Sequence, residues 1–299
     1  MLMSVKFERC FEDLTQLRML KLFYMNLDTI SGATFRSFRL FLVELHLDSC
    51  QIRILDVDTL KNFSKLTVLS LKDNSITYLP DTIFTSLTSL TTLDVSENNL
   101  KVTSGTLLRP LRNLENLFFG GDLDYPMNLT FGEEFLNMTR LRQIAFSART
   151  HSLNSDTFHH LRHSPISDIQ LRFMFMGRIS KEAFLPLRNI TSLSLATPFP
   201  SSGSFFHDAF YGLNGSSLRT LYLSSDKLGD YSAALFEGLT ENNVTSLVMN
   251  ISKIRVIKKG MFSNLVTVSS LDLSNANINQ LENDSLKDLV ELSTLIIDV

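Results

Sequence analysis

The strongest constraint on the fold is a repeat that spans residues 66–100. Apolar residues and one asparagine recur there with a period of 24, in the pattern LxxLxLxxNxL. The first copy contains Leu66, Leu69, Leu71, Asn74 and Ile76, and the second contains Leu90, Leu93, Val95, Asn98 and Leu100. A fixed period of this length predicts stacked units, because a single unit cannot bury its own apolar face.

Within one unit, the spacing of the leucines predicts a short strand followed by a turn. Side chains alternate along a strand, so Leu69 and Leu71 are expected to point inward while Ser70 and Lys72 point outward. Asn74 follows the strand, where its side-chain amide can bond backbone groups at the bend. Each unit should therefore present an apolar inner face and a polar outer face.

The same frame can be placed along almost the whole chain. Its first positions are Leu17, Leu42, Leu66, Leu90, Leu114, Leu141, Ile166, Ile190, Leu218, Val244, Val268 and Leu292, with spacings of 24 to 28 residues. An apolar position behind the strand also recurs, at Phe35, Phe84, Phe135, Phe158, Phe184, Phe210, Phe236 and Phe262, and at Leu60, Leu108 and Leu286. We expect one continuous domain of about twelve repeats over residues 17–299, the last incomplete, after a partial repeat at residues 1–16.

These 24-residue units resemble the typical extracellular class of leucine-rich repeats found in Toll-like receptors and related animal proteins. The resemblance implies an α/β solenoid shaped as a right-handed horseshoe, with a parallel β-sheet on the concave face and irregular or short helical returns on the convex face. It also implies ligand or pattern recognition, with signalling by ectodomain dimerisation in the full-length protein. A non-signalling extracellular adhesion or protein-interaction protein and an intracellular repeat scaffold are the alternatives.

Composition and motifs argue against several other classes. A net charge of −3 gives no bulk attraction to nucleic acid or to an anionic membrane, and outward Lys and Arg are balanced by Asp and Glu. The sequence has no Gly-rich phosphate loop, zinc motif or G-x-S-x-G elbow. We therefore expect that the protein is not an enzyme, binds no cofactor and has no specific nucleic-acid partner. The expected partner is a protein or microbial ligand on the concave face or the inserted loops, together with a homo- or heterodimer of ectodomains.

Localisation rests on two opposing features. The first residues carry Lys6, Glu8 and Arg9 where a secretory signal needs an apolar stretch, and no later segment is apolar enough to span a bilayer. Eight N-x-S/T acceptors nevertheless favour export, at Asn62, Asn128, Asn137, Asn189, Asn214, Asn243, Asn250 and Asn283. We expect a fragment of a protein on the extracellular side of the plasma membrane or in the endosome, attached to the membrane by segments outside this chain.

Cysteines and histidines offer little chemistry. Cys50 occupies the asparagine position of its repeat, and Cys10 precedes the first clear strand. Two buried free thiols are expected, with a disulfide as the alternative. A metal or acid-sensing site is conceivable at His159, His160 and His163. However, no Cys or carboxylate pair completes a ligand set. A solvated surface is the preferred interpretation, so no metal is expected.

The candidate binding surface is a strip of large residues at or beside outward strand positions. Such residues are of the types that dominate protein interfaces. The strip comprises Phe118, Asp168, Arg172, Phe173, Phe175, Phe199 and Tyr222. Rings that tuck under the inserted loops from Gly120 and Ala196 are the alternative. A glycan on Asn250 would lie on the same face and discourage binding near it.

Overall fold

The computed structural model describes residues 10–100, 105–121, 131–148, 152–173, 178–197, 205–226, 235–252 and 254–298. The chain divides into two compact units. Unit 1 comprises Met1–Met127, Gly132–Ser147 and His163–Pro165. Unit 2 comprises Asn128–Phe131, Ala148–Arg162 and Ile166–Val299. The expectation of one continuous domain stays a prediction.

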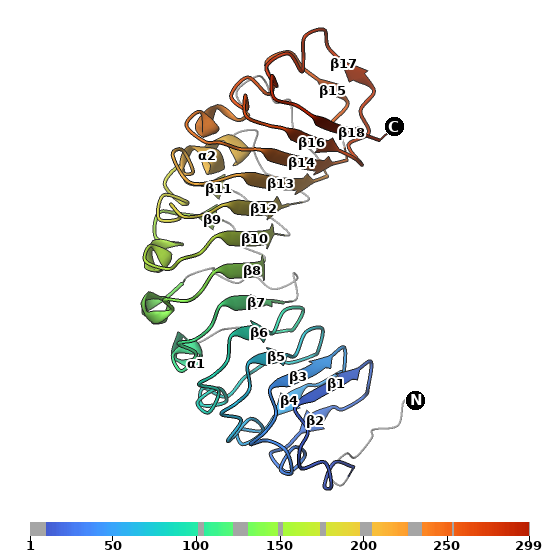
Figure 1. Ribbon diagram of the computed structural model, residues 1–299, viewed down its shortest axis with the longest axis vertical. Coiled ribbons are helices and arrows are strands. Elements are labelled where there is room, and N and C mark those ends of the chain that lie inside the picture. Colours follow the sequence, from blue (N-terminus) through green and yellow to red (C-terminus); the bar gives the residue numbers. More distant parts are fainter. Residues whose placement is uncertain are drawn as a thin grey trace. The chain divides into compact units, whose positions relative to one another are not determined.

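Each unit is built on parallel strands that lie side by side in chain order (Figure 1). Unit 1 contains β1 (Met19–Phe23), β3 (Glu44–Asp48), β5 (Val68–Ser70), β6 (Thr92–Asp94), β7 (Asn116–Gly120) and β8 (Gln143–Ala148). Unit 2 contains β10 (Asp168–Phe173), β12 (Ser192–Ala196), β13 (Thr220–Ser225), β14 (Ser246–Ile251), β16 (Ser270–Leu273) and β18 (Thr294–Ile297). Every one of these strands begins two residues after a frame position, so the predicted solenoid and its parallel sheet are confirmed.

The strand register pairs residues that hold the same place in successive repeats. Leu45 is opposite Leu69, and Leu69 is opposite Leu93. Each of these leucines is fully buried. In β3 and β6, the residues directly before and after the leucine in the strand face outward. One apolar row therefore stacks on the next, which is how units that cannot fold alone share a core.

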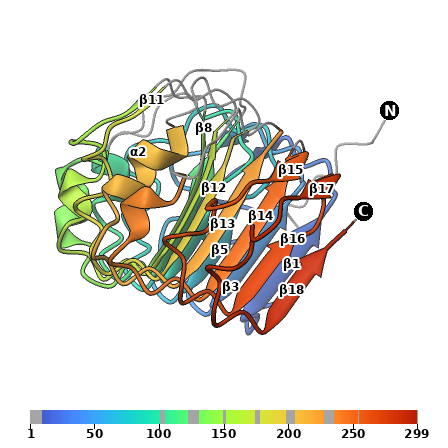
Figure 2. The ribbon, with the colours of Figure 1, turned by 90° about the horizontal axis from the view of Figure 1, so that it is seen from above.

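The return segments behind the strands contain turns and short helices. The helices are α1 (Gly105–Leu108), α2 (Phe205–Tyr211) and the 3₁₀ helices η1 (Glu133–Asn137), η2 (His159–Leu161) and η3 (Glu237–Leu239). Short strand pairs also form there, β2 (Thr29–Ile30) with β4 (Ile54–Leu55), β9 (Ser152–Leu153) with β11 (Arg178–Ile179), and β15 (Val256–Ile257) with β17 (Gln280–Leu281). In unit 2, α2 lies on the side of the coil opposite β12, β13 and β14 (Figure 2). The expected short helical returns are confirmed.

Phenylalanine side chains fill the space between strands and returns. The rings of Phe210 and Phe236 are stacked with centroids 5.6 Å apart, and those of Phe236 and Phe262 with centroids 6.1 Å apart. All three side chains are fully buried. The repeated core position holds eight of the 23 Phe of the chain, and all eight are buried.

Asparagine closes the turns where the repeat pattern is intact. The Asn74 Oδ1 accepts hydrogen bonds from the backbone N–H groups of Cys50 and Ile52, at 3.0 and 2.9 Å. Its Nδ2 donates to the carbonyls of Leu47 and Leu71, both at 2.8 Å. Because Asn74 is buried, these bonds satisfy backbone groups that water cannot reach.

The cysteine prediction is half right. Both thiols are free; Cys50 is fully buried, but Cys10 is exposed. Cys50 donates through Sγ to the Leu22 carbonyl at 3.3 Å and so occupies the turn position as a small polar group. Cys10 lies before β1, where no preceding described coil covers it.

Candidate functional site

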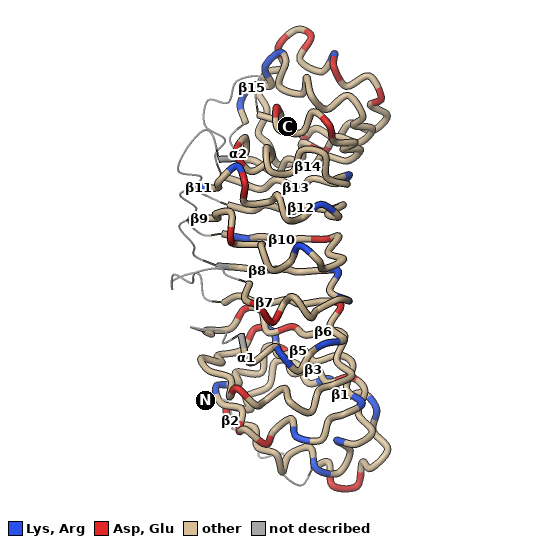
Figure 3. Tube along the Cα trace, turned by 90° about the vertical axis from the view of Figure 1, so that its left-hand side faces the viewer, with Lys and Arg blue, Asp and Glu red and all other residues tan. Residues whose placement is uncertain are grey.

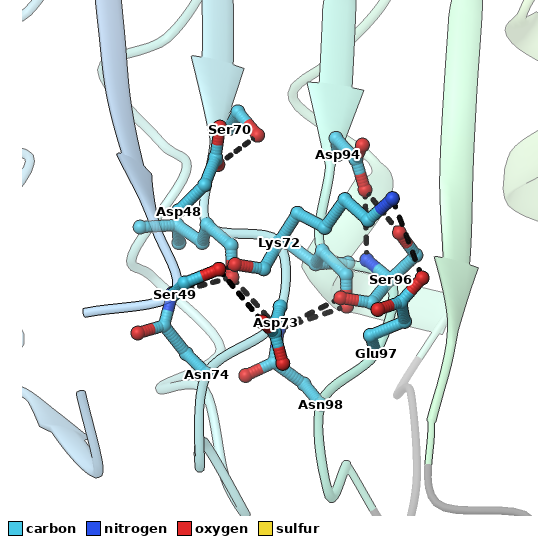
Figure 4. A network of polar contacts seen from close by, with 12 residues as sticks. Asp48, Ser49, Ser70, Lys72, Asp73, Asn74, Asp94, Ser96, Glu97 and Asn98 are labelled. Atoms are coloured by element: carbon cyan, nitrogen blue, oxygen red, sulfur yellow. Dashed lines mark hydrogen bonds and ion pairs between the residues drawn. The ribbon is translucent and has the colours of Figure 1, made fainter. Parts of the chain in front are cut away.

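The outward face of unit 1 carries a polar cluster that joins three neighbouring repeats. We call it the Lys72 cluster, and it comprises Asp48, Ser70, Lys72, Asp94, Ser96 and Glu97 (Figure 4). The residues come from the ends of β3, β5 and β6 and from the turns that follow these strands. Frame positions explain the assembly, since Asp48, Lys72 and Ser96 are equivalent residues 24 positions apart.

Hydrogen bonds and one ion pair hold the Lys72 cluster together. Lys72 Nζ lies 3.3 Å from Glu97 Oε1, and Ser70 donates through Oγ to Asp48 Oδ1. Asp94 Oδ1 accepts from the Ser96 hydroxyl at 2.6 Å and from the Ser96 N–H at 2.9 Å. The outward side chains of three coils are therefore fixed relative to one another.

Electrostatics within the cluster are coupled. Burial raises the pKa of Asp94, an effect that the bonds from Ser96 and the charge of Lys72 oppose and that Asp48 reinforces. The pKa of Lys72 is also raised: partial burial lowers it, but the charges of Glu97, Asp94 and Asp48 outweigh that effect. Two acidic neighbours on different strands thus favour the charged form of Lys72.

Phe118 borders this cluster. It is opposite Asp94 in the register of β6 and β7, and it is half-buried with its side chain on the outward face. The predicted outward position of Phe118 agrees with the structure. An aromatic ring beside a partly buried carboxyl reduces the access of water to that carboxyl.

In unit 2, the outward face carries small and medium-sized side chains around two large ones. One register row contains Gln170, Ser194, Tyr222, Val248 and Asp272, and a second contains Arg172, Ala196, Ser224 and Asn250. Tyr222 and Arg172 are the large residues among small neighbours in their rows. Their side chains are therefore available to a partner from the direction of solvent.

Tyr222 forms a side-chain hydrogen bond with the neighbouring strand. Asn250 donates through Nδ2 to the Tyr222 hydroxyl at 3.3 Å. Both side chains are half-buried and belong to adjacent strands, β13 and β14. Asn250 therefore holds the tyrosine hydroxyl by a hydrogen bond from the neighbouring strand.

The remaining residues of the predicted strip have different outcomes. Arg172 is exposed and Asp168 is half-buried, both on β10. Phe173 was expected near the outward face, but it is only 1% exposed, so it does not contribute to a surface. Side chains in β10 keep alternating beyond Leu171, so Arg172 points outward and Phe173 points inward. Ile251 points inward for the same reason at the end of β14. Phe175 and Phe199 lie outside the described residues.

The insertion after Ala196 is partly a buried element. Its end forms α2, in which Phe206 and Phe210 are fully buried. Those two rings pack against the coil interior, so they offer no binding surface on an inserted loop.

The acceptor asparagines fall at different levels of exposure. Asn62, Asn137, Asn189, Asn243 and Asn283 are exposed, Asn214 and Asn250 are half-buried, and Asn128 lies outside the described residues. Asn250 differs because it is a strand residue on the outward face. Its predicted outward position agrees with the structure, whereas glycosylation at any of the sites stays a prediction.

The histidines do not assemble a metal site in the described part of the chain. His159 and His163 are exposed, and His160 forms a 2.7 Å hydrogen bond between Nδ1 and the Phe131 carbonyl oxygen. No group of three or more His, Cys, Asp or Glu among the described residues could hold a metal ion. On the side that Figure 3 presents, described charges of both signs are interspersed within each unit.

Family comparisons agree with the repeat architecture. The leucine rich repeat family matches residues 41–100, 64–122 and 242–298. The BspA type leucine rich repeat region matches residues 130–241. Together with the register of the strands, these matches identify the chain as a leucine-rich repeat protein.

Its sequence relatives are Toll-like receptors. The chain is 27% identical to Toll-like receptor 3 of Boselaphus tragocamelus over 193 residues, which cover 61% of this chain and 21% of the receptor. It is 28% identical to human Toll-like receptor 8 over 209 residues, which cover 63% of this chain and 19% of that receptor. The chain thus resembles part of a Toll-like receptor ectodomain, and the match spans about a fifth of each receptor.

Solved structures show the same fold. The structure of the Drosophila Toll–Spatzle complex matches with a TM-score of 0.60 and 19% identity, over 99% of this chain and 35% of that chain. A leucine-rich repeat protein of Leptospira interrogans matches with a TM-score of 0.56 and 19% identity, over 91% of this chain and 64% of that chain.

Among the described residues, no helix has the length and apolar character needed to cross a membrane.

Proposed function

We propose that this chain belongs to the ligand-recognition region of a Toll-type ectodomain, and that the outward face of its sheet binds a protein or microbial ligand. The observation that carries this proposal is the position of Tyr222 and Arg172 on β13 and β10 of unit 2. Both large side chains face outward from the sheet, and their neighbours Ser194, Ala196 and Val248 are smaller.

Residue type supports binding at this place. Tyr and Arg are enriched among the interface residues that contribute most to affinity, because both combine contact area with directional hydrogen bonds. Arg172 shares a register row with Ser224, two strands away, which corresponds to roughly 10 Å. A partner segment laid across β10, β12 and β13 can contact Arg172 and Tyr222 together.

The Lys72 cluster and Phe118 give unit 1 a separate contribution. Hydrogen bonds already restrain the side chains of the cluster. Binding of a ligand to them therefore costs little additional side-chain entropy. Phe118 adds a half-buried ring beside Asp94. Each unit thus offers a contact surface of its own.

Position-specific crosslinking tests this function. A photoreactive phenylalanine analogue is placed at Tyr222, and in a second variant at Ser194, its register neighbour. Each protein is exposed to extracellular fluid and cell-surface extract from the source organism, and crosslinked proteins are identified by mass spectrometry. The same partner should be captured at both positions.

The matched control carries the photoreactive residue at Tyr211. This tyrosine is also in unit 2 and is 56% exposed, but it belongs to α2 in a return segment. Capture of the same proteins at Tyr211 as at Tyr222 would argue against a specific outward-face site.

For the whole protein, we propose that ligand binding brings two ectodomains together, as a homodimer or heterodimer, outside the cell or in the endosomal lumen. The similarity to Toll-like receptors supports this assignment. Adhesion without signalling is the alternative function. The full-length transcript separates the two, because a receptor requires a cytoplasmic signalling domain in the same product.

A further inference from the structure

A depression on the return side of unit 1 is lined mostly by charged and polar residues. It has a volume of about 580 Å³ and is lined by residues 31–33, Arg36, Arg39, 56–58, Lys61 and Asn62. The lining comes from the return segments of the first two coils, which the pairing of β2 with β4 brings together. Its volume lies within the range of ordinary ligand pockets, roughly 300–1,000 Å³.

The wall of the depression is fixed by a close approach of backbone. A Cβ added at Gly32 would lie 2.6 Å from the carbonyl oxygen of Asp58. The two return segments can therefore approach this closely only because residue 32 has no side chain. Thr59 adds a hydrogen bond from Oγ1 to the Ile30 carbonyl at 2.7 Å, which ties the same segments together.

The charges in the depression are unequally satisfied. Lys61 Nζ pairs with Asp58 Oδ1 at 3.3 Å. Among the described residues, the guanidinium groups of Arg36 and Arg39 have no ion pair or hydrogen bond, and the same is true of the Asp56 carboxylate. Two unused cations and one unused anion thus line one cavity.

This arrangement specifies the chemistry of an occupant. Planar guanidinium groups bind sulfate, phosphate and carboxylate oxygens through paired hydrogen bonds. Asp56 would repel a second negative charge but can accept hydrogen bonds from hydroxyl groups. A suitable ligand carries one oxyanion next to several hydroxyl donors.

We propose that the depression binds a saccharide bearing a single sulfate or phosphate ester. Arg36 and Arg39 bind the ester oxygens, while Asp56 accepts hydrogen bonds from sugar hydroxyls. Val57, which is 53% exposed at the rim, supplies an apolar contact for the sugar ring. This site lies on the return side and is independent of the proposed binding by the outward face.

A titration with defined sugars tests the proposal. The probes are glucose 6-sulfate, glucose 6-phosphate, inorganic sulfate and unmodified glucose, added to the isotope-labelled 299-residue chain. The amide NMR signals of Gly32 and Ala33 report binding, and dissociation constants follow from the shifts. At least one sugar ester should bind at least about tenfold more tightly than inorganic sulfate and than glucose.

Variants assign the contacts. Replacing both arginines, Arg36→Gln with Arg39→Gln, should weaken binding of the sugar ester at least about tenfold. Asp56→Asn should reduce the preference for the ester over inorganic sulfate. Arg255→Gln is the matched control, since Arg255 is exposed in unit 2, and it should leave binding unchanged.

Three results would overturn the proposal. The first is the absence of shifts at Gly32 and Ala33 with both sugar esters at millimolar concentration. The second is unchanged affinity in the folded double arginine variant, with folding checked by circular dichroism. The third is equal affinity for inorganic sulfate and the esters, which would indicate a simple anion site. The two esters distinguish a sulfated from a phosphorylated ligand.

Discussion

The side chain of Asn74 accepts a hydrogen bond from the backbone N–H of Cys50, 24 residues earlier, at 3.0 Å. One amide thereby closes the turn of the preceding coil as well as its own, where Nδ2 reaches the Leu71 carbonyl at 2.8 Å. At this position, the asparagine that recurs with the repeat also couples one coil to the preceding coil.

Asn74→Ala should lower the free energy of unfolding by about 3 kcal/mol, because buried backbone groups lose their partners. Asn99→Ala is the control: Asn99 is exposed, and its change should stay within about 0.5 kcal/mol. Chemical denaturation measures both. Equal effects of the two substitutions would contradict the structural role of Asn74.

Removal of one ring from the phenylalanine stack should be costly. Phe236 lies between Phe210 and Phe262 and is fully buried, so Phe236→Ala should destabilise the protein by about 3–5 kcal/mol. Phe41→Ala, at a ring that is 38% exposed, should cost clearly less. Thermal and denaturant unfolding compare the variants, and similar losses would exclude a stacked core at Phe236.

The two thiols should differ sharply in reactivity. Cys10 is exposed, whereas Cys50 is buried and burial raises the pKa of its thiol. Iodoacetamide should modify Cys10 in the native protein and Cys50 only after denaturation, as read by peptide mass spectrometry. Rapid native modification of Cys50, or a disulfide between the two cysteines, would contradict the structure.

Asp94 should make stability depend on pH in a defined direction. Its pKa is raised above the ordinary value of 3.8, so ionisation disfavours the folded state. This penalty is absent below the ordinary pKa and grows as pH rises through the raised pKa. As the pH rises from about 4 to about 7, the Asp94→Asn variant should therefore lose less stability than the protein that retains Asp94.

Two further variants test the cause of that shift. Phe118→Ala should admit water and lower the pKa of Asp94 toward its ordinary value, as followed by NMR titration of the carboxyl. Asp272→Asn controls for substitution in a similar turn, because Asp272 Oδ1 accepts the Ser274 N–H at 2.8 Å. An unchanged pKa of Asp94 in Phe118→Ala would rule out shielding by the ring.

A glycan at Asn250 should interfere with the outward face. Asn250 Nδ2 is both the acceptor atom of the sequon and the donor to the Tyr222 hydroxyl. If mass spectrometry of secreted protein finds a glycan there, Asn250→Gln and Ser252→Ala should both increase partner binding. A glycan on the exposed Asn189 provides the comparison, and its removal should leave binding unchanged.

Much of the fold follows from the sequence because the frame is periodic. Twelve frame positions predict the starts of the strands in both units, and the recurring Phe position predicts the stacked rings. The paired β2 and β4 were not predicted, because segments of two residues leave no periodic signal. Cys10 was misplaced because burial at the first coil depends on what precedes it.

The candidate site was less predictable. Tyr222 and Arg172 were found because large residues interrupt a series of small outward ones. Phe173 was misassigned because the strand alternation continues further in β10 than the core pattern indicates. The Lys72 cluster was missed as a unit, although alignment of repeats places Asp48, Lys72 and Ser96 in one column.

The most direct test of the outward-face proposal is the affinity of the partner captured at Tyr222 for purified variants. Tyr222→Ala and Arg172→Ala should each weaken binding at least about tenfold, while Tyr211→Ala should not. Arg172→Ala and Tyr211→Ala should keep the native unfolding temperature, since both side chains are exposed, and circular dichroism should show that Tyr222→Ala is folded. Unchanged affinity in both outward-face variants would contradict recognition through this surface.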